Sequence, residues 1–478
     1  MIEAKDFSGA YVGGRWVDAK TTFDVTNPAT GAVIAKVADL DAGGITAAID
    51  AAVAAMPAWA AKTAHERAAV LHKWAGLLMQ HQEDLAQLMT AEQGKPLTES
   101  RGEVAYGASF ITWFAEEAKR AYGEVIPTMV AGKRYLTLRQ PSGVAAAITP
   151  WNFPIAMLAR KVGPALAVGC AMVAKPAEET PLCALAMARL ADEAGVPAGV
   201  FNVVTTMDAA GAGRVLCEHP KVRVLSFTGS TEVGKILYRQ SAGTMKKLAL
   251  ELGGNAPVLV FDDADLDRAV AASMASKFRN AGQTCVCANR LYVQAGIYDA
   301  FLERFTAAAR ALKVGPGAEA GVEIGPLINA DAMAKVVRLV GDATAKGAKI
   351  ELGGHADARG GQFYAPTVLS AVTAEMQVSR EEIFGPVAPV VRFETEEEGI
   401  ALANAASVGL AAYVFTRDLS RTIRVSEALE VGIVAVNDGV PAVAAAPFGG
   451  VKESGIGREG GRQGLDEYMD TKYVCIGL

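Results

Sequence analysis

The sequence is poor in the residues that build disulfide frameworks and metal sites. Its 478 residues include only 6 cysteines and 5 histidines. So few cysteines in so long a chain do not make a disulfide framework, and they favour a reducing compartment. His65 and Glu66 begin like a zinc-protease motif, but Ala69 occupies the position of the second histidine. Because no histidines stand at ligand spacing, we expect no metal site.

An excess of positive charge and long apolar runs are also lacking. Lys and Arg number 46 against 52 Asp and Glu, a net charge of −6, whereas nucleic acid binding usually needs a clustered positive face. The N-terminus has no basic region followed by an apolar run, and the apolar segment 165–174 is too short to span a bilayer. We therefore expect a cytoplasmic protein without a nucleic acid or membrane partner.

The residues that are abundant are typical of α/β packing. Hydrophobic residues make up 51% of the chain and glycine occupies 49 positions, and a chain of this length is too long for one ordinary core. Short strands are expected over 11–40 and helices over 43–120. One apolar stripe in the helical region recurs at helical spacing and predicts one face of a helix, on which His81 packs: Val70, Trp74, Leu77, His81, Leu85 and Leu88.

Strand-like and helical segments alternate further along the chain, which predicts parallel sheets. The candidate strands are 144–149, 171–175, 200–204 and 222–227, and 181–194 is a helix between two of them. A second α/β region extends over 262–435, with strands near 290–293 and 431–436. Two further segments, 133–139 and 471–478, alternate like exposed edge strands. They form either subunit contacts or an ordinary edge hairpin.

The segment 278–287 contains a cysteine, Cys285, among Gly, Asn, Gln and Thr residues. A thiol in such a polar setting can attack a carbonyl, and a carboxylate such as Glu251, beside a glycine pair, can activate water against the resulting thioester. The alternative is a buried structural cysteine, which is the commoner role of a free thiol. Cys285 alone does not decide between the two, and the other motifs favour catalysis.

Further candidate residues follow two of the expected strands. Asn152 stands at the carboxyl end of the first strand, where an amide can donate to a developing oxyanion, and Trp151 offers a face to a ring. An aromatic turn between two prolines, packed on a helix, is the alternative. Lys175 and Glu178 end the next strand, and a carboxylate there suits ribose hydroxyls and repels a 2′-phosphate.

The sequence predicts that a strand passes into a helix at 227–236, where Gly229 and Gly234 let the backbone approach a phosphate. The segment nearly matches a phosphate-binding P-loop, but Ile236 replaces the Mg²⁺-binding hydroxyl, which argues against a nucleotide hydrolase or switch. The Gly-x-Gly-x-x-Gly fingerprint is absent at this turn, and the chain has no Gly-x-Ser-x-Gly nucleophile elbow.

Taken together, these motifs resemble the aldehyde dehydrogenase superfamily, most closely its NAD(P)-dependent succinate-semialdehyde dehydrogenases. The resemblance extends almost from end to end and keeps the order and spacing of the family. It implies an α/β fold with a Rossmann-like cofactor domain, an α/β catalytic domain and a β-strand oligomerisation element. The segments that carry it are 149–154, 175–178, 227–234, 251–257, 278–287, 381–386 and 447–459.

The resemblance assigns the chemistry to three residues. Cys285 would attack an aldehyde to form a thiohemiacetal, whose oxyanion is held by the Asn152 side chain and the Cys285 backbone N–H. Hydride transfer to the nicotinamide leaves a thioester, and Glu251 activates the water that hydrolyses it. The residues implied in binding the cofactor are Trp151, Lys175, Glu178, Gly229, Ser230, Gly234, Glu382 and Phe384. Glu178 makes NAD the expected cofactor, although Lys175 can serve NADP as well.

The semialdehyde enzymes in this family imply that Arg160 and Arg279 hold the distal carboxylate of the substrate. Succinate semialdehyde is then the expected substrate. One departure weakens this assignment, because close relatives carry a serine before the Pro447 motif, whereas the loop 438–447 has no hydroxyl. Glutarate semialdehyde or an uncharged aldehyde is therefore the alternative.

Cys287 lies two residues beyond Cys285 and is a candidate redox partner of the nucleophile. A disulfide between them that reversibly switches activity off is one hypothesis, and simple packing of Cys287 is the other.

The resemblance also implies a domain organisation. The cofactor domain is expected over 1–120 and 142–250, with 436–455 returning to it, and the catalytic domain over 251–435. The segments 121–141 and 456–478 are the expected oligomerisation element of a homodimer or homotetramer. Two alternatives are a P-loop nucleotide-binding protein and a catalytically inactive structural relative. Ile236 argues against the first, and the presence of Cys285 and Glu251 argues against the second.

Overall fold

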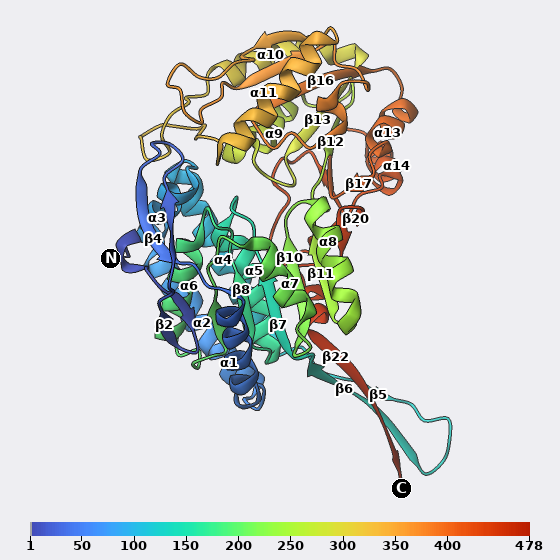
Figure 1. Cartoon of the computed structure of the whole chain (residues 1–478). Coiled ribbons are helices and arrows are strands. Elements are labelled where there is room, and N and C mark those ends of the chain that lie inside the picture. The colour runs from blue at the N-terminus through green and yellow to red at the C-terminus, as the bar shows by residue number, and fades with distance from the viewer. Residues whose placement is uncertain (1) are drawn as a thin grey trace.

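In the computed structural model, which describes residues 2–478, the chain forms two α/β lobes and a projecting β-arm (Figure 1). Each lobe is built on its own sheet, and the C-terminus lies at the tip of the arm. The α/β class and the parallel character of both sheets are confirmed, because most neighbouring strands run parallel.

The first lobe contains an eight-stranded sheet whose parallel centre consists of the strands expected from the apolar runs. Alternate residues of these central strands enter two different cores, because helices cover both faces of the sheet. Ala145 and Met172 pack with one set of helices, and Ala146 and Val173 with the other. In spatial order the strands are β2 (Arg15–Val17), β1 (Ala10–Val12), β9 (Phe201–Val203), β8 (Met172–Lys175), β7 (Val144–Ile148), β10 (Val222–Thr228), β11 (Lys247–Glu251) and β21 (Gly455–Ile456).

The apolar stripe from Val70 to Leu88 belongs to two helices, so the expectation of one helix face is wrong. His81, with φ −101° and ψ 22°, ends one helix and immediately precedes the next, and its ring contacts Asp84 at 3.2 Å. The periodicity did not reveal this break because both helices bury the same side. The helices of this lobe are α1 (Ala42–Ala60), α2 (Ala64–Gln80), α3 (Gln82–Gln93), α4 (Leu97–Ala118), α5 (Pro154–Val168), α6 (Pro181–Ala194), α7 (Ala209–Glu218) and α8 (Thr231–Ser241).

Within the described part of the chain, α1 is the single helix long and apolar enough to cross a membrane by length and composition. Its Ile45, Ala48 and Ile49 are buried in the core under the first sheet. One such helix is weak evidence for a membrane span, since core helices pass the same test.

The second lobe contains a seven-stranded sheet. The chain enters it after β11 and leaves it after the strand at Ile433–Val436, returning to the first lobe through β21. Its strands in spatial order are β14 (Lys349–Leu352), β15 (Thr367–Ser370), β16 (Val387–Phe393), β13 (Ala288–Gln294), β12 (Ala256–Val260), β18 (Ala411–Phe415) and β19 (Ile433–Val436). Its helices are α9 (Leu266–Phe278), α10 (Tyr298–Arg310), α11 (Ala330–Ala345), α12 (Gln377–Arg380), α13 (Glu396–Asn404) and α14 (Leu419–Ala428).

The two expected edge segments pair with each other and form the arm. Strand β6 (Lys133–Pro141) lies between β22 (Met469–Gly477) and β5 (Val125–Ile126), and all pairs are antiparallel. The arm extends away from both lobes (Figure 1). The remaining strands are the hairpin β3 (Thr22–Thr26) with β4 (Val33–Ala38) and the pair β17 (Val408–Gly409) with β20 (Val451–Lys452).

Candidate active site

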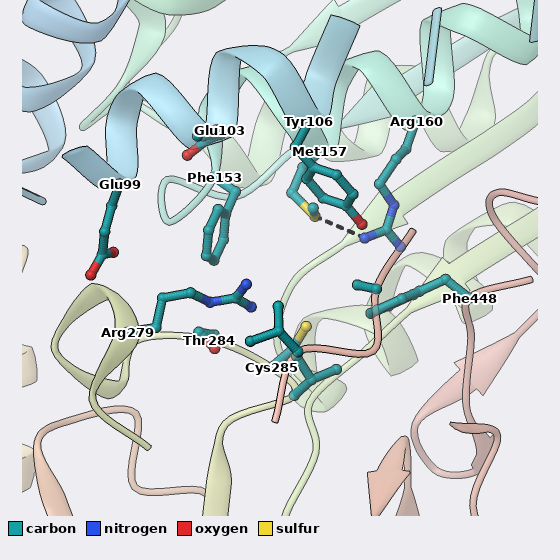
Figure 2. A pocket seen from close by; sticks show the side chains of 14 residues that line it. Glu99, Glu103, Tyr106, Phe153, Met157, Arg160, Arg279, Thr284, Cys285 and Phe448 are labelled. Atoms are coloured by element: carbon teal, nitrogen blue, oxygen red, sulfur yellow. Dashed lines mark hydrogen bonds between the residues drawn. The ribbon is translucent and has the colours of Figure 1, made fainter. Parts of the chain in front are cut away.

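Cys285 lies between the lobes, in the loop that precedes β13, and borders two cavities. One cavity of about 300 Å³ is lined by Cys285 together with Arg160 and Arg279 (Figure 2). The other, of about 340 Å³, is lined by Cys285 together with Trp151 and Asn152. A nucleophile in a wall shared by two cavities can meet a reactant from each side. We call them the first and the second cavity.

The backbone that leads to Cys285 is strained. Asn280 and Ala281 have φ of 50° and 54°, a left-handed conformation that residues other than glycine rarely adopt. The surrounding structure holds it, because the Asn280 N–H donates to Glu99 at 2.8 Å and the Asn280 side chain donates to the Asn152 carbonyl at 3.0 Å. This left-handed turn lies just before Cys285, and sequence patterns did not reveal it.

Asn152 is anchored beside Cys285 at the start of α5. Its Nδ2 donates to the Gln283 carbonyl at 2.9 Å, and its own carbonyl accepts from Lys95 Nζ at 2.6 Å. Since an amide nitrogen carries two hydrogens, the second hydrogen of Asn152 remains available to an oxyanion. Because the Gln283 carbonyl can only accept a hydrogen bond, the Nδ2 atom of Asn152, and not its Oδ1, must face it. The expected proximity of Asn152 and Cys285 is thus present, and the oxyanion role remains a prediction.

Glu251 ends β11 and is buried, 3% exposed, but it lines neither cavity. Its Oε2 has no hydrogen-bond partner among residues 2–478. Burial raises the pKa of Glu251 well above its usual value, and the nearby Glu459 carboxylate raises it further. The raised pKa favours the protonated form of Glu251 in this conformation, and its role as the base that activates water remains a prediction.

A buried cluster of charges surrounds Glu251. Glu459 forms an ion pair of 2.6 Å with Arg160 and a second one with Lys161, which also donates to Thr228 at 2.7 Å. Burial alone would raise the pKa of Glu459, but the Arg160 and Lys161 charges hold it below its usual value. Glu459 is therefore the ionised partner of the two cations, which disfavours a second charge on Glu251.

The Cys285 thiol is protonated in this environment. Burial raises its pKa to about 12, and the positive charges of Arg160 and Arg279 act in the opposite direction. The thiolate thus needs a base or a bound partner at the moment of attack.

The two arginines expected to hold the distal carboxylate of a substrate both line the first cavity. They differ in whether the guanidinium already has an ionic partner in the protein. Arg160 is already paired with Glu459 and lies 3.9 Å from the centre of the Phe448 ring. The Arg279 guanidinium lies 5.4 Å from the Phe153 ring and has neither a hydrogen bond nor an ion pair with the described residues. Arg279 is accordingly the cation that remains free for a ligand.

The rest of the first cavity is mostly apolar. The loop 438–447 contributes Val440 and Ala442 to the wall. Because this loop contains no hydroxyl, it offers the substrate no side-chain hydrogen-bond donor there. Other apolar side chains in the wall are Phe153, Met157, Val286 and Phe448. An acidic tail therefore has few groups to bind besides Arg279.

Five of the eight residues expected to bind a cofactor line the second cavity, namely Trp151, Gly229, Ser230, Glu382 and Phe384. The Trp151 and Phe384 rings meet edge to face at 5.5 Å, and burial raises the pKa of Glu382 to about 7. Ser230 caps α8, whose unpaired N–H groups favour a phosphate. An aromatic wall, a carboxyl for hydroxyl groups and a helix N-terminus fit a nicotinamide dinucleotide.

The other three expected cofactor residues lie outside this cavity. Lys175, the last residue of β8, pairs with Glu178 at 2.7 Å. A side chain on Gly234 would collide with Leu252, at 2.4 Å, so this glycine allows α8 to pack closely on the residues after β11. Packing explains Gly234 without a phosphate, and its contact with a cofactor remains a prediction.

Cys287 is buried and lines neither cavity. Its thiol donates to the carbonyls of Lys277 at 3.5 Å and Ala288 at 3.6 Å, and both Cys287 and Cys285 are free thiols. The hypothesis of a disulfide between them requires the loop to rearrange, and it remains a prediction.

The structure reveals functional candidates that the sequence did not indicate. Lys161 and Glu459 surround Glu251, and Lys95 supports Asn152, whereas Lys335 of α11 lines the second cavity. Glu459 lies inside the motif 447–459, which was the only signal available for it. No group of three or more His, Cys, Asp or Glu side chains in residues 2–478 is arranged to hold a metal ion.

Comparison with known proteins agrees with this site. A sequence model of the aldehyde dehydrogenase family matches residues 16–474. The succinate-semialdehyde dehydrogenase [NADP(+)] GabD of Escherichia coli K12 is 58% identical, over 98% of each chain. A 3-sulfolactaldehyde dehydrogenase of Pseudomonas putida is 56% identical, over 100% of this chain and 99% of the relative. The crystal structure of succinate-semialdehyde dehydrogenase from Burkholderia pseudomallei superimposes with a TM-score of 0.98, 54% identity and 98% coverage of both chains.

Proposed function

Because the chain belongs to the aldehyde dehydrogenase family, we propose that it oxidises a short aldehyde with an acidic tail, succinate semialdehyde first, to the carboxylic acid. The observation that supports this substrate class is the free Arg279 guanidinium in the wall of the first cavity, beside the nucleophile. A guanidinium without a protein partner favours a carboxylate ligand.

Catalysis begins on this proposal at Cys285. Once its thiol proton has passed to a base from solvent, the sulfur attacks the aldehyde carbon from the shared wall of the two cavities, and the carbonyl oxygen becomes an oxyanion. The free hydrogen of Asn152 Nδ2 and the backbone N–H of Cys285 stabilise that oxyanion. Lys95 and the Gln283 carbonyl hold Asn152 in place, so the donor is oriented before the substrate arrives.

On this proposal the second cavity would hold the cofactor, with Trp151 and Phe384 binding its nicotinamide ring and Glu382 a ribose. A bound nicotinamide cofactor supplies the acceptor for the hydride that leaves the thiohemiacetal carbon. The side chain of Glu251 must then rotate out of its buried cluster toward Cys285, where its carboxylate accepts a proton from the water that attacks the thioester. Because Glu251 Oε2 has no hydrogen-bond partner among the described residues, the rotation breaks no hydrogen bond at that atom.

We expect Arg279→Ala to remove the preference for acidic aldehydes. The kcat/KM for succinate semialdehyde falls about 100-fold, since a charge-assisted hydrogen bond contributes about 1.5–3 kcal/mol, while the value for hexanal stays within a factor of three. The measurement is kcat/KM with NAD for succinate semialdehyde, glutarate semialdehyde, 3-sulfolactaldehyde and hexanal.

Arg310→Ala, a change at the end of α10 far from both cavities, is the matched control and retains wild-type values. A wild-type enzyme that prefers hexanal, together with an unaffected Arg279 variant, would leave an aldehyde dehydrogenase for uncharged substrates. Among acidic aldehydes, 3-sulfolactaldehyde is the second candidate, because the hydroxyl-free loop and the relative acting on that compound favour it.

We expect Glu178→Ser to shift the cofactor preference from NAD toward NADP. The change removes a negative charge that repels a 2′-phosphate, and it frees Lys175 from its 2.7 Å ion pair. Because Glu178 is partly exposed, the change in the ratio of kcat/KM values is about tenfold. Both cofactors are compared in steady-state assays, with Glu193→Ser on the exposed end of α6 as control. A wild-type enzyme more efficient with NADP contradicts the predicted NAD preference.

The domain roles follow from the same proposal. The lobe of residues 1–120 and 142–250, to which 436–455 return, binds the cofactor, and residues 251–435 form the catalytic lobe. The segments 121–141 and 456–478, which include the arm, mediate formation of a homodimer or homotetramer. The unpaired edges of β5 and β22 support the last assignment. The cytoplasmic location and the absence of metal, membrane and nucleic acid partners stay predictions from the sequence.

A further inference from the structure

The first cavity contains a buried phenol hydroxyl that no described residue engages. Tyr106 of α4 lines this cavity, and its phenol oxygen has no hydrogen-bond partner within residues 2–478. The ring is held by an edge-to-face contact with Phe110, at 4.8 Å and 71°. Buried polar groups nearly always have a partner, so an unpaired hydroxyl that faces a cavity is available to a ligand bound there.

Two arginines, Arg160 and Arg279, act on this hydroxyl, and two carboxyl groups, Glu99 and Glu103, line the same cavity. Figure 2 shows Tyr106 and Arg160 side by side above the cavity, with Arg279 across from them on the side of Cys285. Burial raises the pKa of Tyr106, and the Arg160 and Arg279 charges act in the opposite direction. The phenol therefore keeps its proton, and since arginine offers no acceptor, that proton is free to be donated to an anion.

No other residue on that side of the cavity provides a neutral hydroxyl. The loop 438–447 presents only Val440 and Ala442, and Thr284 stands next to the nucleophile. Arg160 is partly neutralised by its ion pair with Glu459. The Thr284 hydroxyl also lacks a partner within residues 2–478, but it stands at the nucleophile. A carboxylate at the far end of a substrate therefore meets Arg279 as the cation without a protein partner and Tyr106 as the unpartnered hydroxyl.

We propose that the Tyr106 hydroxyl donates a hydrogen bond to the distal carboxylate of the substrate and so determines specificity for acidic aldehydes. The proposal rests on the proposed function of this site. It also assigns to α4 the hydroxyl contact that the loop 438–447 lacks.

The test is Tyr106→Phe, which removes the hydroxyl and keeps the ring contact with Phe110. We expect the KM for succinate semialdehyde to rise about tenfold, the effect of losing one hydrogen bond to a charged group, with kcat and the kcat/KM for hexanal within a factor of two. Succinate, the product with the same distal carboxylate, is expected to bind about tenfold more weakly in calorimetry. Tyr292→Phe removes a phenol hydroxyl that donates to the Leu402 carbonyl and lines neither cavity, and it is expected to leave all these values unchanged.

The outcomes distinguish the role of Tyr106 from the proposed oxidation of acidic aldehydes. A wild-type enzyme that favours semialdehydes, together with a Tyr106→Phe variant that binds succinate as tightly as wild type, overturns the role of Tyr106 and keeps the proposed function. Equal losses for succinate semialdehyde and hexanal overturn it as well, because they indicate a packing role. A wild-type enzyme that favours hexanal overturns the proposed function, and the inference with it.

Discussion

Cys285→Ala is expected to abolish aldehyde oxidation, lowering kcat/KM at least about 10⁴-fold, which corresponds to about 5.5 kcal/mol of transition-state stabilisation. The reason is geometric and chemical together. Cys285 is the one thiol among the residues that line both cavities, and without its sulfur no thiohemiacetal forms. The measurement is the initial rate of reduced cofactor formation at saturating cofactor and varied semialdehyde.

Cofactor binding is the internal check on this variant. The aromatic and acidic walls of the second cavity, formed by Trp151, Phe384 and Glu382, are unchanged in Cys285→Ala. The dissociation constant of NAD from quenching of tryptophan fluorescence is therefore expected to stay within a factor of three. Loss of both activity and binding would indicate a damaged site, and the variant would then say nothing about a nucleophile.

Cys287→Ala is the matched control for the same segment. This thiol is buried against Lys277 and Ala288 and lines neither cavity, so its removal is expected to change kcat/KM less than threefold. Comparable losses in the two cysteine variants, or more than 1% residual activity in Cys285→Ala, would contradict the assignment of the nucleophile.

Glu251→Gln is expected to separate the two halves of the reaction. Acylation of Cys285 still occurs, so a rapid mix yields a burst of reduced cofactor that approaches one equivalent per site. Hydrolysis of the thioester then lacks its base, and the steady-state rate falls about 10³-fold, within the range of general base catalysis. Stopped-flow absorbance of the reduced cofactor measures both phases.

The pH dependence of the steady state follows from the same carboxyl. Burial and Glu459 raise the pKa of Glu251, and only the deprotonated form accepts a proton from water. The wild-type rate is therefore lost as the pH falls through this raised pKa, well above the usual range of a glutamate, and it recovers as the pH rises. In Glu251→Gln this acidic limb disappears from the deacylation rate.

Glu92→Gln is the control for a buried glutamate outside the site. Burial also raises the pKa of Glu92, to about 7, but its oxygens accept from the backbone of Leu182 and Cys183 at the start of α6. This variant is expected to retain the wild-type burst, kcat and pH profile. A Glu251→Gln enzyme without a burst, or with an unaltered acidic limb, would show that this carboxyl is not the deacylation base.

Local patterns in the sequence were sufficient for the elements and for the nucleophile. The helix 181–194 and the strands around Val144, Met172 and Val222 follow from periodicity and from Pro and Gly at their ends. Such patterns depend on neighbouring residues, which the sequence displays directly. The motif order that identified the family is likewise a one-dimensional property, and it also indicated Asn152 and Arg279 as residues near Cys285.

Only the tertiary structure decided how the charges of the site are shared. The pairing of Arg160 with Glu459 joins residues almost 300 positions apart, and it leaves Arg279 as the free cation. Whether Glu251 faces the thiol or a buried cluster, and whether Tyr106 finds a partner, depends on which side chains arrive from other elements. Side-chain pairing and burial are properties of the packed chain, so local sequence cannot specify them. The sequence alone was thus sufficient to identify the family, whereas the fold determines which polar groups are available to a substrate.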